Sequence, residues 1–278
     1  LILNSSPQNF EHPFFSVVLD GVQAKAKEYG YSIGFKYIQN ELNNPAVLHK
    51  VMHENVVDGI IVLAEYLRQD IQEQLKNHYE HIVVANTNFN NKLDCDVIHV
   101  DRKKAAYDAV KYLIDLGHKK IAYIGGIIPG EIFNSVREEP RFEGYKKALE
   151  EAGLEIGEKY IKDGSWTLEG GFKRTEELMD LEDIPSAIFT ASDLMGIGSL
   201  RAAHEMGLDI PEDISIVSFD DIKMAKFTNP PLTTVHFPKV EKGKMAVWIL
   251  MKRMNDELDK IPLNITLPTK LKVRKSTQ

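Results

Sequence analysis

The sequence contains a single cysteine, Cys95, among its 278 residues. One cysteine excludes an intramolecular disulfide and offers no thiolate cluster for zinc. This cysteine usage fits a reducing cytoplasm, where we expect the protein to be located.

Long hydrophobic runs are also missing. Nowhere do 18 or more apolar residues follow one another, so we expect no membrane span. The first fifteen residues lack the basic segment and apolar run of a secretory signal peptide.

No concentrated basic face is evident. The formal net charge is −7, and the Lys and Arg residues are scattered along the chain. Because a surface for duplex DNA needs clustered positive charge, we expect this chain alone to bind DNA poorly.

Enzyme signatures are absent, so we expect no catalytic residue, no metal site and no cofactor. The sequence has neither a G-x-S-x-G nucleophile motif nor a G-x-x-x-x-G-K-[ST] phosphate loop. Gly196 and Gly198 lie inside a predicted helix instead of before one, and His99 with Asp101 lacks a further metal ligand. The Asp220-Asp221 pair resembles catalytic carboxylates, but neighbouring side chains in a strand or turn tend to point apart.

Short apolar runs, often β-branched, alternate with helical segments throughout the chain. This pattern is typical of strands buried on both faces of a parallel sheet. The predicted strands are 31–37, 59–63, 82–85, 97–100, 121–125, 187–190 and 214–219, with a last strand near 267–273.

The segments between the strands have apolar residues at helical spacing. One predicted helix ends at Gly30, as at a C′ glycine, and others end before Gly117, before Gly153 and near Gly207. A further helix is expected over 240–254. So many β–α units favour two linked, doubly wound α/β subdomains over one open sheet. A TIM barrel is the competing fold, but the segment after Asp221 does not continue the alternation.

Polar side chains follow several predicted strands, where ligands of open parallel sheets bind. These residues are Asp101, Arg141, Trp166, Ser192, Asp193, Asp220 and Asp221. Carboxylates and an arginine can pair with sugar hydroxyls, and an indole can pack on the apolar face of a pyranose.

Each candidate also has a purely structural interpretation. Ser192 or Asp193 could cap the following helix, and Asp221 could be a turn residue. Arg141 could form a structural ion pair, and Trp166 could be a core or interface residue. His12 could be a surface histidine that precedes a helix.

Several sequence blocks resemble the LacI/GalR family of transcriptional regulators. Two of them, Ile210-Pro-Glu-Asp-Ile-Ser and Pro230-Pro-Leu-Thr-Thr, are specific when they occur together at this spacing. The others are 58–62, 116–125, 141–149 and 191–193, and the resemblance runs from about Phe14 to the C-terminus. Periplasmic sugar-binding proteins share the fold but rarely carry both specific blocks.

The resemblance implies a type I periplasmic-binding-protein-like architecture with an effector cleft between two subdomains. The expected subdomains are 1–116 with 237–265, and 117–236 with 266–278, joined by three hinge crossovers. It further implies a homodimer, part of whose interface we place around 227–231, and a helix-turn-helix domain upstream of Leu1 that binds operator DNA.

The resemblance also suggests effector-binding residues. Arg141 matches the arginine that grips effector hydroxyls, Asp220 the aspartate facing it, and Trp166 a stacking tryptophan. Ser192 stands where other members have Asn or Asp, and His12 replaces the usual Asn. The remaining predicted contacts are Phe14, Phe15, Phe237 and Asp101.

The sequence therefore predicts the effector-binding and dimerisation part of a LacI-type repressor that senses a small sugar. The resemblance also admits a protein corepressor, as some Gram-positive members use. One rival is the sugar-binding protein of a transporter, which would be a monomer with an export signal. The other is an enzyme acting on sugars, with Asp220 as its base.

Overall fold

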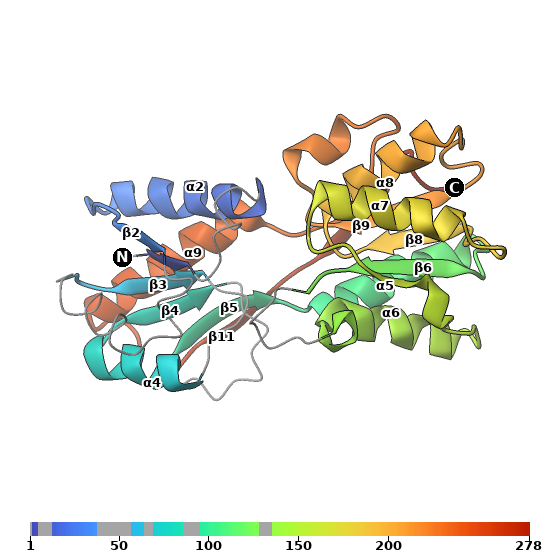
Figure 1. Cartoon of the computed structure of the whole chain (residues 1–278). Coiled ribbons are helices and arrows are strands. Elements are labelled where there is room, and N and C mark those ends of the chain that lie inside the picture. Colours follow the sequence, from blue (N-terminus) through green and yellow to red (C-terminus); the bar gives the residue numbers. More distant parts are fainter. Residues whose placement is uncertain (1, 5–12, 38–56, 64–68, 86–94, 128–134) are drawn as a thin grey trace. The chain divides into compact units, whose positions relative to one another are not determined.

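The computed structural model describes residues 2–4, 13–37, 57–63, 69–85, 95–127 and 135–278. It divides into two compact units, the first comprising 1–100 and 238–268 and the second 101–237 and 269–278 (Figure 1). The chain therefore passes between the units three times.

The first unit is built on a parallel sheet with strand order β11-β5-β4-β3-β1-β2. Helices α2 and α9 pack against each other, and α9 also contacts β3, β4 and β5. Helix α4 lies on the other side of this sheet (Figure 1). The bounds are β1 Ile2–Asn4, α2 Pro13–Glu28, β2 Phe35–Tyr37, β3 Ile60–Leu63, α4 Gln69–His78, β4 Ile82–Ala85, β5 Asp96–Val100, α9 Lys239–Met254 and β11 Asn264–Leu267.

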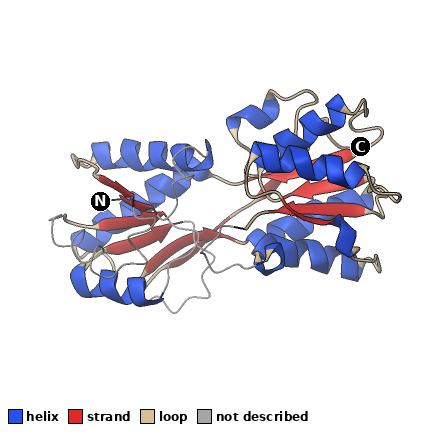
Figure 2. Ribbon diagram, in the orientation of Figure 1, coloured by secondary structure: helices blue, strands red, loops and turns tan. Residues whose placement is uncertain are grey.

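The second unit contains a sheet of order β12-β10-β9-β8-β6-β7, in which β12 runs antiparallel to β10 and the other pairs are parallel. Helices α5 and α6 cover one face and α7 and α8 the other (Figure 2). The bounds are α5 Arg102–Asp115, β6 Ile121–Gly125, η2 Val136–Glu138, α6 Pro140–Glu151, η3 Glu158–Tyr160, β7 Ile161–Asp163, α7 Leu168–Met179, β8 Ala187–Thr190, α8 Asp193–Glu205, β9 Ser215–Phe219, η4 Lys223–Lys226, β10 Thr233–His236 and β12 Lys270–Lys272.

Two sheets, each flanked by helices, confirm the predicted α/β class and rule out the barrel. The last strand predicted near 267–273 is confirmed as β12, which belongs to the second sheet. Strand β11, which ends at Leu267 and belongs to the first sheet, was not predicted. Strands β7 and β10 were not predicted, and the strand expected over 31–37 begins only at Phe35.

Helix α5 belongs to the second unit, whereas the sequence prediction assigned residues 101–116 to the first. The reason is its packing partner: α5 lies against α6 and against strands of the second sheet. At the α5–α6 contact, a Cβ on Gly144 would lie 2.1 Å from the carbonyl oxygen of Lys103, so the two backbones approach too closely for any other residue. The first chain crossing therefore comes before α5, between residues 100 and 101.

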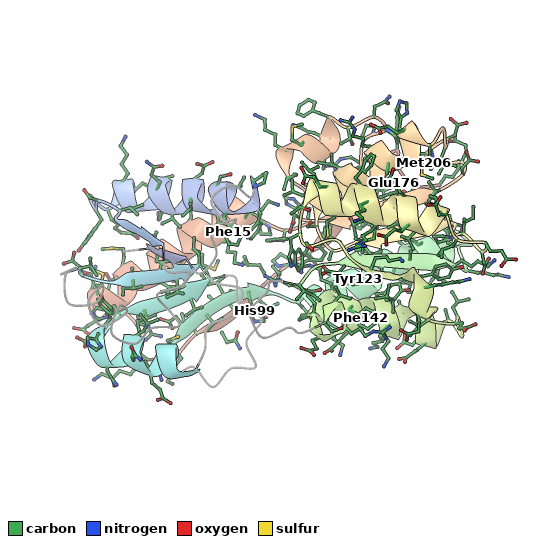
Figure 3. The ribbon with its side chains drawn as sticks, viewed as in Figure 1. Phe15, His99, Tyr123, Phe142, Glu176 and Met206 are labelled. Carbon is green, nitrogen blue, oxygen red and sulfur yellow. The ribbon has the colours of Figure 1, made fainter. Side chains whose placement is uncertain are left out.

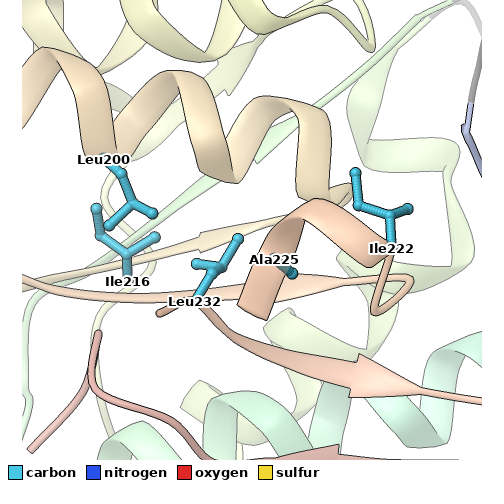
Figure 4. Close-up of a cluster of buried hydrophobic side chains, with 5 residues drawn as sticks. All are labelled: Leu200, Ile216, Ile222, Ala225 and Leu232. Carbon is cyan, nitrogen blue, oxygen red and sulfur yellow. The ribbon is translucent and has the colours of Figure 1, made fainter. Parts of the chain in front are cut away.

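A cluster of buried apolar residues fixes the segment after β9 in the second unit (Figure 4). Full burial of a Leu or Ile side chain contributes roughly 1.5–3 kcal/mol to stability. The cluster joins η4 and the preceding turn to α8 and β9, and consists of Leu200, Ile216, Ile222, Ala225 and Leu232.

Candidate functional site

The carboxyl ends of β6, β7, β8 and β9 meet at one edge of the second sheet, because these strands are parallel. The residues after them are the expected location of a ligand in an open parallel sheet. They are Gly126 after β6, Trp166 after β7, Ser192 after β8, and Asp220 after β9.

Arg141 lies at the start of α6 and is 3% exposed. Pro140 occupies the first turn, where its fixed φ suits a helix start, and Glu139 is the N-cap. The Arg141 guanidinium carbon lies over two aromatic rings, 4.6 Å from the centroid of Phe219 and 5.3 Å from that of Trp166. The arginine, the indole and the strand end that precedes Asp220 are therefore adjacent.

Glu139 is a buried partner of Arg141 that the sequence did not reveal. One carboxylate oxygen lies 2.5 Å from Nη1 of Arg141, and the other accepts the backbone N–H of Arg141 at 2.9 Å. The hydroxyl of Tyr123 donates to the same carboxylate at 3.1 Å. Tyr123 packs beside Phe142 within this unit (Figure 3), and burial raises its pKa well above the ordinary value. Glu is a poor N-cap by statistics, so local pattern alone did not single it out.

Trp166 is half-buried and has a positive φ of 60°. The turn before it is held by Asp163, whose carboxylate accepts the backbone N–H groups of Ile127 at 3.1 Å and Ser165 at 2.9 Å. Gly126 allows the indole to come close, since a Cβ there would lie 2.5 Å from the indole nitrogen. The ring is thus positioned by two loops, not by a helix or strand.

Asp220 is 5% exposed and has a φ of 112°, a conformation that residues other than glycine rarely adopt. Such backbone strain costs about 1–3 kcal/mol and is concentrated at functional positions. The backbone N–H of Asp220 donates to the carbonyl of Val235 at 3.0 Å. Asp221, for which the sequence left both a turn role and a binding role open, also has a positive φ of 51°.

Ser192, not Asp193, caps helix α8, accepting the N–H of Met195 at 3.4 Å. Asp193 is fully buried and accepts the hydroxyl of Thr234 at 2.6 Å and the N–H of Ile222 at 2.7 Å. Burial and the nearby charge of Asp220 raise the pKa of Asp193 to about 7. These hydrogen bonds of the Asp193 carboxyl group hold the turn that contains Asp220 in place.

The remaining residues predicted to contact the effector lie on several different elements. Phe237 is buried, with its ring centroid 6.1 Å from that of Phe219. Asp101 is exposed and caps α5 by accepting the N–H of Lys104 at 2.8 Å. Phe14 and Phe15 are buried on α2 in the first unit, where Figure 3 labels Phe15. His12 lies outside the described residues.

Two further features concern the described part of the chain only. None of its helices is long and apolar enough to cross a membrane. Within those same residues, no group of three His, Cys, Asp or Glu side chains could hold a metal ion.

Comparison with known proteins assigns the architecture. Residues 110–277 match the family described as a periplasmic binding protein-like domain. The HTH-type transcriptional repressor CytR of Escherichia coli is 33% identical over 245 residues, which cover 88% of this chain and 70% of that protein. PurR of Haemophilus influenzae, also an HTH-type repressor, is 33% identical over 270 residues, covering 96% of this chain and 79% of that protein. The structure of a LacI family regulator from Enterococcus faecium with bound ribose superposes with a TM-score of 0.85 at 26% identity, covering 99% of this chain and 98% of that one.

Proposed function

Because this chain belongs to the LacI/GalR family of transcriptional regulators and forms its effector-binding core, we propose that it senses a sugar or sugar derivative. The ligand binds at the carboxyl edge of the second sheet, and its binding changes the affinity of the regulator for operator DNA. The operator is contacted by a helix-turn-helix domain, as the names of its relatives suggest.

The observation that carries this proposal is the adjacency of Arg141, Trp166 and the strand end before Asp220. A guanidinium offers rigid N–H donors to hydroxyl and ring oxygens, and a carboxylate accepts from hydroxyls. An indole covers the C–H face of a sugar ring. The ribose bound by the structural relative from E. faecium supports the same ligand class.

Asp221 links the residues next to the bound ligand with the segments where the chain crosses between the two units. It follows Asp220 directly and pairs with Arg274, which follows β12, and with His236 at the end of β10. These two strands adjoin the second and third chain crossings. A ligand shifts such a two-state equilibrium only by its difference in affinity for the states, and a typical coupling changes affinity by about 5–150-fold.

The regulator acts as a homodimer, whose two-fold symmetry suits a palindromic operator. Phe227 is 67% exposed and Met224 is 56% exposed, so η4 and the residue that follows it present two large apolar side chains to solvent. We place part of the interface there, around 227–231. The relatives named above are repressors. They do not favour the two alternative hypotheses, the sugar-binding protein of a transporter and an enzyme acting on sugars.

The test is a thermal-shift screen of this chain against mono- and disaccharides, their phosphates, and purines. A ligand at one hundred times its dissociation constant stabilises the native state by about 2.7 kcal/mol. We expect a sugar to raise the melting temperature, and Arg141→Ala and Trp166→Ala to abolish the shift.

Two matched substitutions control for general damage. Arg201 and Trp248 are exposed on α8 and α9, so Arg201→Ala and Trp248→Ala should leave the ligand shift intact. If only purines bind, or if Arg141→Ala retains the sugar shift, the proposed site is wrong. If nothing binds, a protein corepressor becomes the leading explanation.

A further inference from the structure

We propose that the first unit contains a second ligand site, a cavity between α2, α9 and β3 that binds a small organic cation with an apolar body, such as an aromatic amine. All the described residues that line this cavity belong to the first unit, whereas the proposed effector site is built from residues of the second. The proposal therefore does not depend on the nature of the effector.

The packing of α2 against α9 explains why a cavity forms. A Cβ on Gly21 of α2 would lie 2.0 Å from the carbonyl oxygen of Val240 on α9. A Cβ on Gly243 of α9 would lie 2.1 Å from the carbonyl oxygen of Val18, so the two backbones are in contact here. Packed helices cross at an angle, and they therefore separate away from their point of closest approach.

The space beyond this contact is a cavity of about 230 Å³, far larger than the roughly 10–15 Å³ that one water molecule needs. Its walls are apolar. Val22 from α2, Ile61 from β3 and Val247 from α9 are buried side chains of the wall, to which Met251 and Met254 of α9 also contribute. Sugar hydroxyls would lose their hydrogen bonds to water against these side chains, whereas an apolar group gains free energy from burial there.

Two exposed polar side chains set the charge that the cavity accepts. Asp58 lies just before β3 and Tyr31 just after α2, and both line the cavity. Within the described part of the chain, the Asp58 carboxylate and the Tyr31 hydroxyl have no hydrogen-bond or ion-pair partner, so both are available to a ligand.

The described lining includes no Lys, Arg or His, so the carboxylate of Asp58 is its only formal charge. A cation can pair with this carboxylate and can also lie over the face of the Tyr31 ring. An anion would be repelled by the same carboxylate. The apolar wall and the single negative charge together favour a cationic group on an apolar body.

Methionine methyl groups allow a direct test of occupancy. The chain, with isotope-labelled methionine methyls, is titrated with phenethylamine and followed by NMR. We expect the signals of Met251 and Met254 to shift with saturation, and those of Met206 and Met224, which belong to the second unit, to stay unchanged. The absence of a saturable shift at Met251 and Met254 overturns the proposal.

Two further probes of similar shape test the sign of the charge. Phenethyl alcohol is neutral and should bind about two- to fivefold more weakly than phenethylamine, the effect of an exposed ion pair. Phenylacetate is an anion and should bind more weakly still. Equal or tighter binding of either probe overturns the assignment of a cation.

Asp58→Asn should weaken phenethylamine binding by about two- to fivefold and leave the binding of phenethyl alcohol unchanged. Asp20→Asn is the matched control, because Asp20 is an exposed acidic residue of α2 outside the cavity lining. It should leave both affinities unchanged. Equal effects of the two substitutions would show a general influence of net charge and would overturn the role of Asp58.

Ala26→Leu fills the cavity from α2 and should abolish binding of both the amine and the alcohol. If this variant does not fold, Val57→Phe fills the cavity from the segment before β3. Retained binding in a folded, cavity-filled variant overturns the site. Arg141→Ala alters only the proposed effector site and should leave amine binding intact, so a loss of binding in this variant would place the amine there and overturn the second site.

Discussion

The guanidinium of Arg274 contacts the carboxylate of Asp221 at 2.5 Å, joining the C-terminal segment to the turn after β9. The other oxygen of Asp221 lies 2.8 Å from Nδ1 of His236. Arg274 also donates to the carbonyl of Leu232 at 2.7 Å. Segments separated by more than fifty residues are thus tied together beside the strained Asp220.

We expect Arg274→Gln to lower the free energy of unfolding by about 2 kcal/mol, because it removes charge-assisted hydrogen bonds from a mostly buried site. Urea denaturation measures this loss. Arg201→Gln removes an exposed pair with Glu205 and should cost less than about 1 kcal/mol. Equal losses for the two variants would show that Asp221 is not held by this contact.

Asp193 makes stability depend on pH. Burial, and then the charge of Asp220, raise its pKa from an ordinary 3.8 to about 7 in the folded state. The folded state therefore keeps a proton that the unfolded state releases between these values. Its contribution to the free energy of unfolding is largest below about pH 4 and falls, by up to about 4 kcal/mol, as the pH rises to about 7.

Asp193→Asn should remove this decrease of the free energy of unfolding with pH. Urea denaturation at a series of pH values would measure it. The exposed Asp108→Asn variant should retain it. A slope that persists unchanged in Asp193→Asn would contradict the assignment.

Gly126→Ala should displace the indole of Trp166, because the added Cβ would lie 2.5 Å from its nitrogen. We expect a stability loss of about 1–3 kcal/mol, as for other overpacked sites, together with weaker ligand binding. Tryptophan fluorescence in a Trp248→Phe background reports the indole directly, since the chain has two tryptophans. Gly153→Ala is a suitable control: it adds strain at a φ of 66° with open space around it, so stability should fall while the emission stays unchanged.

Phe227→Glu should weaken the proposed dimer at least about tenfold, the effect of losing an apolar interface anchor. Sedimentation equilibrium would measure the association. Met206→Glu places the same charge at another exposed apolar residue of this unit, on the far end of α8, and should leave association unchanged. A dimer insensitive to Phe227→Glu would move the interface elsewhere.

Local pattern predicted much of the fold. The helix ends expected at Gly30, Gly117, Gly153 and Gly207 are confirmed, and all four glycines have a positive φ. The buried central strands of both sheets were likewise predicted, because continuous apolar runs require burial on both faces.

The candidate site was predictable only in part. The rule that ligands bind beyond the carboxyl ends of parallel strands selects Arg141, Trp166 and Asp220 from the sequence alone. It could not reveal that Glu139 neutralises Arg141, or that Asp193 is enclosed behind Asp220, because both depend on which loops meet.

The sequence by itself determined the α/β class, the helix ends and the residues at the strand ends, since each follows from local periodicity or from the backbone freedom of glycine. The tertiary structure alone decided that α5 belongs to the second unit, that 264–272 supplies one strand to each sheet, and that Arg141 is paired. The physical reason is the same in each case: packing partners and buried charges are chosen among segments far apart in the chain, and no local pattern records that choice.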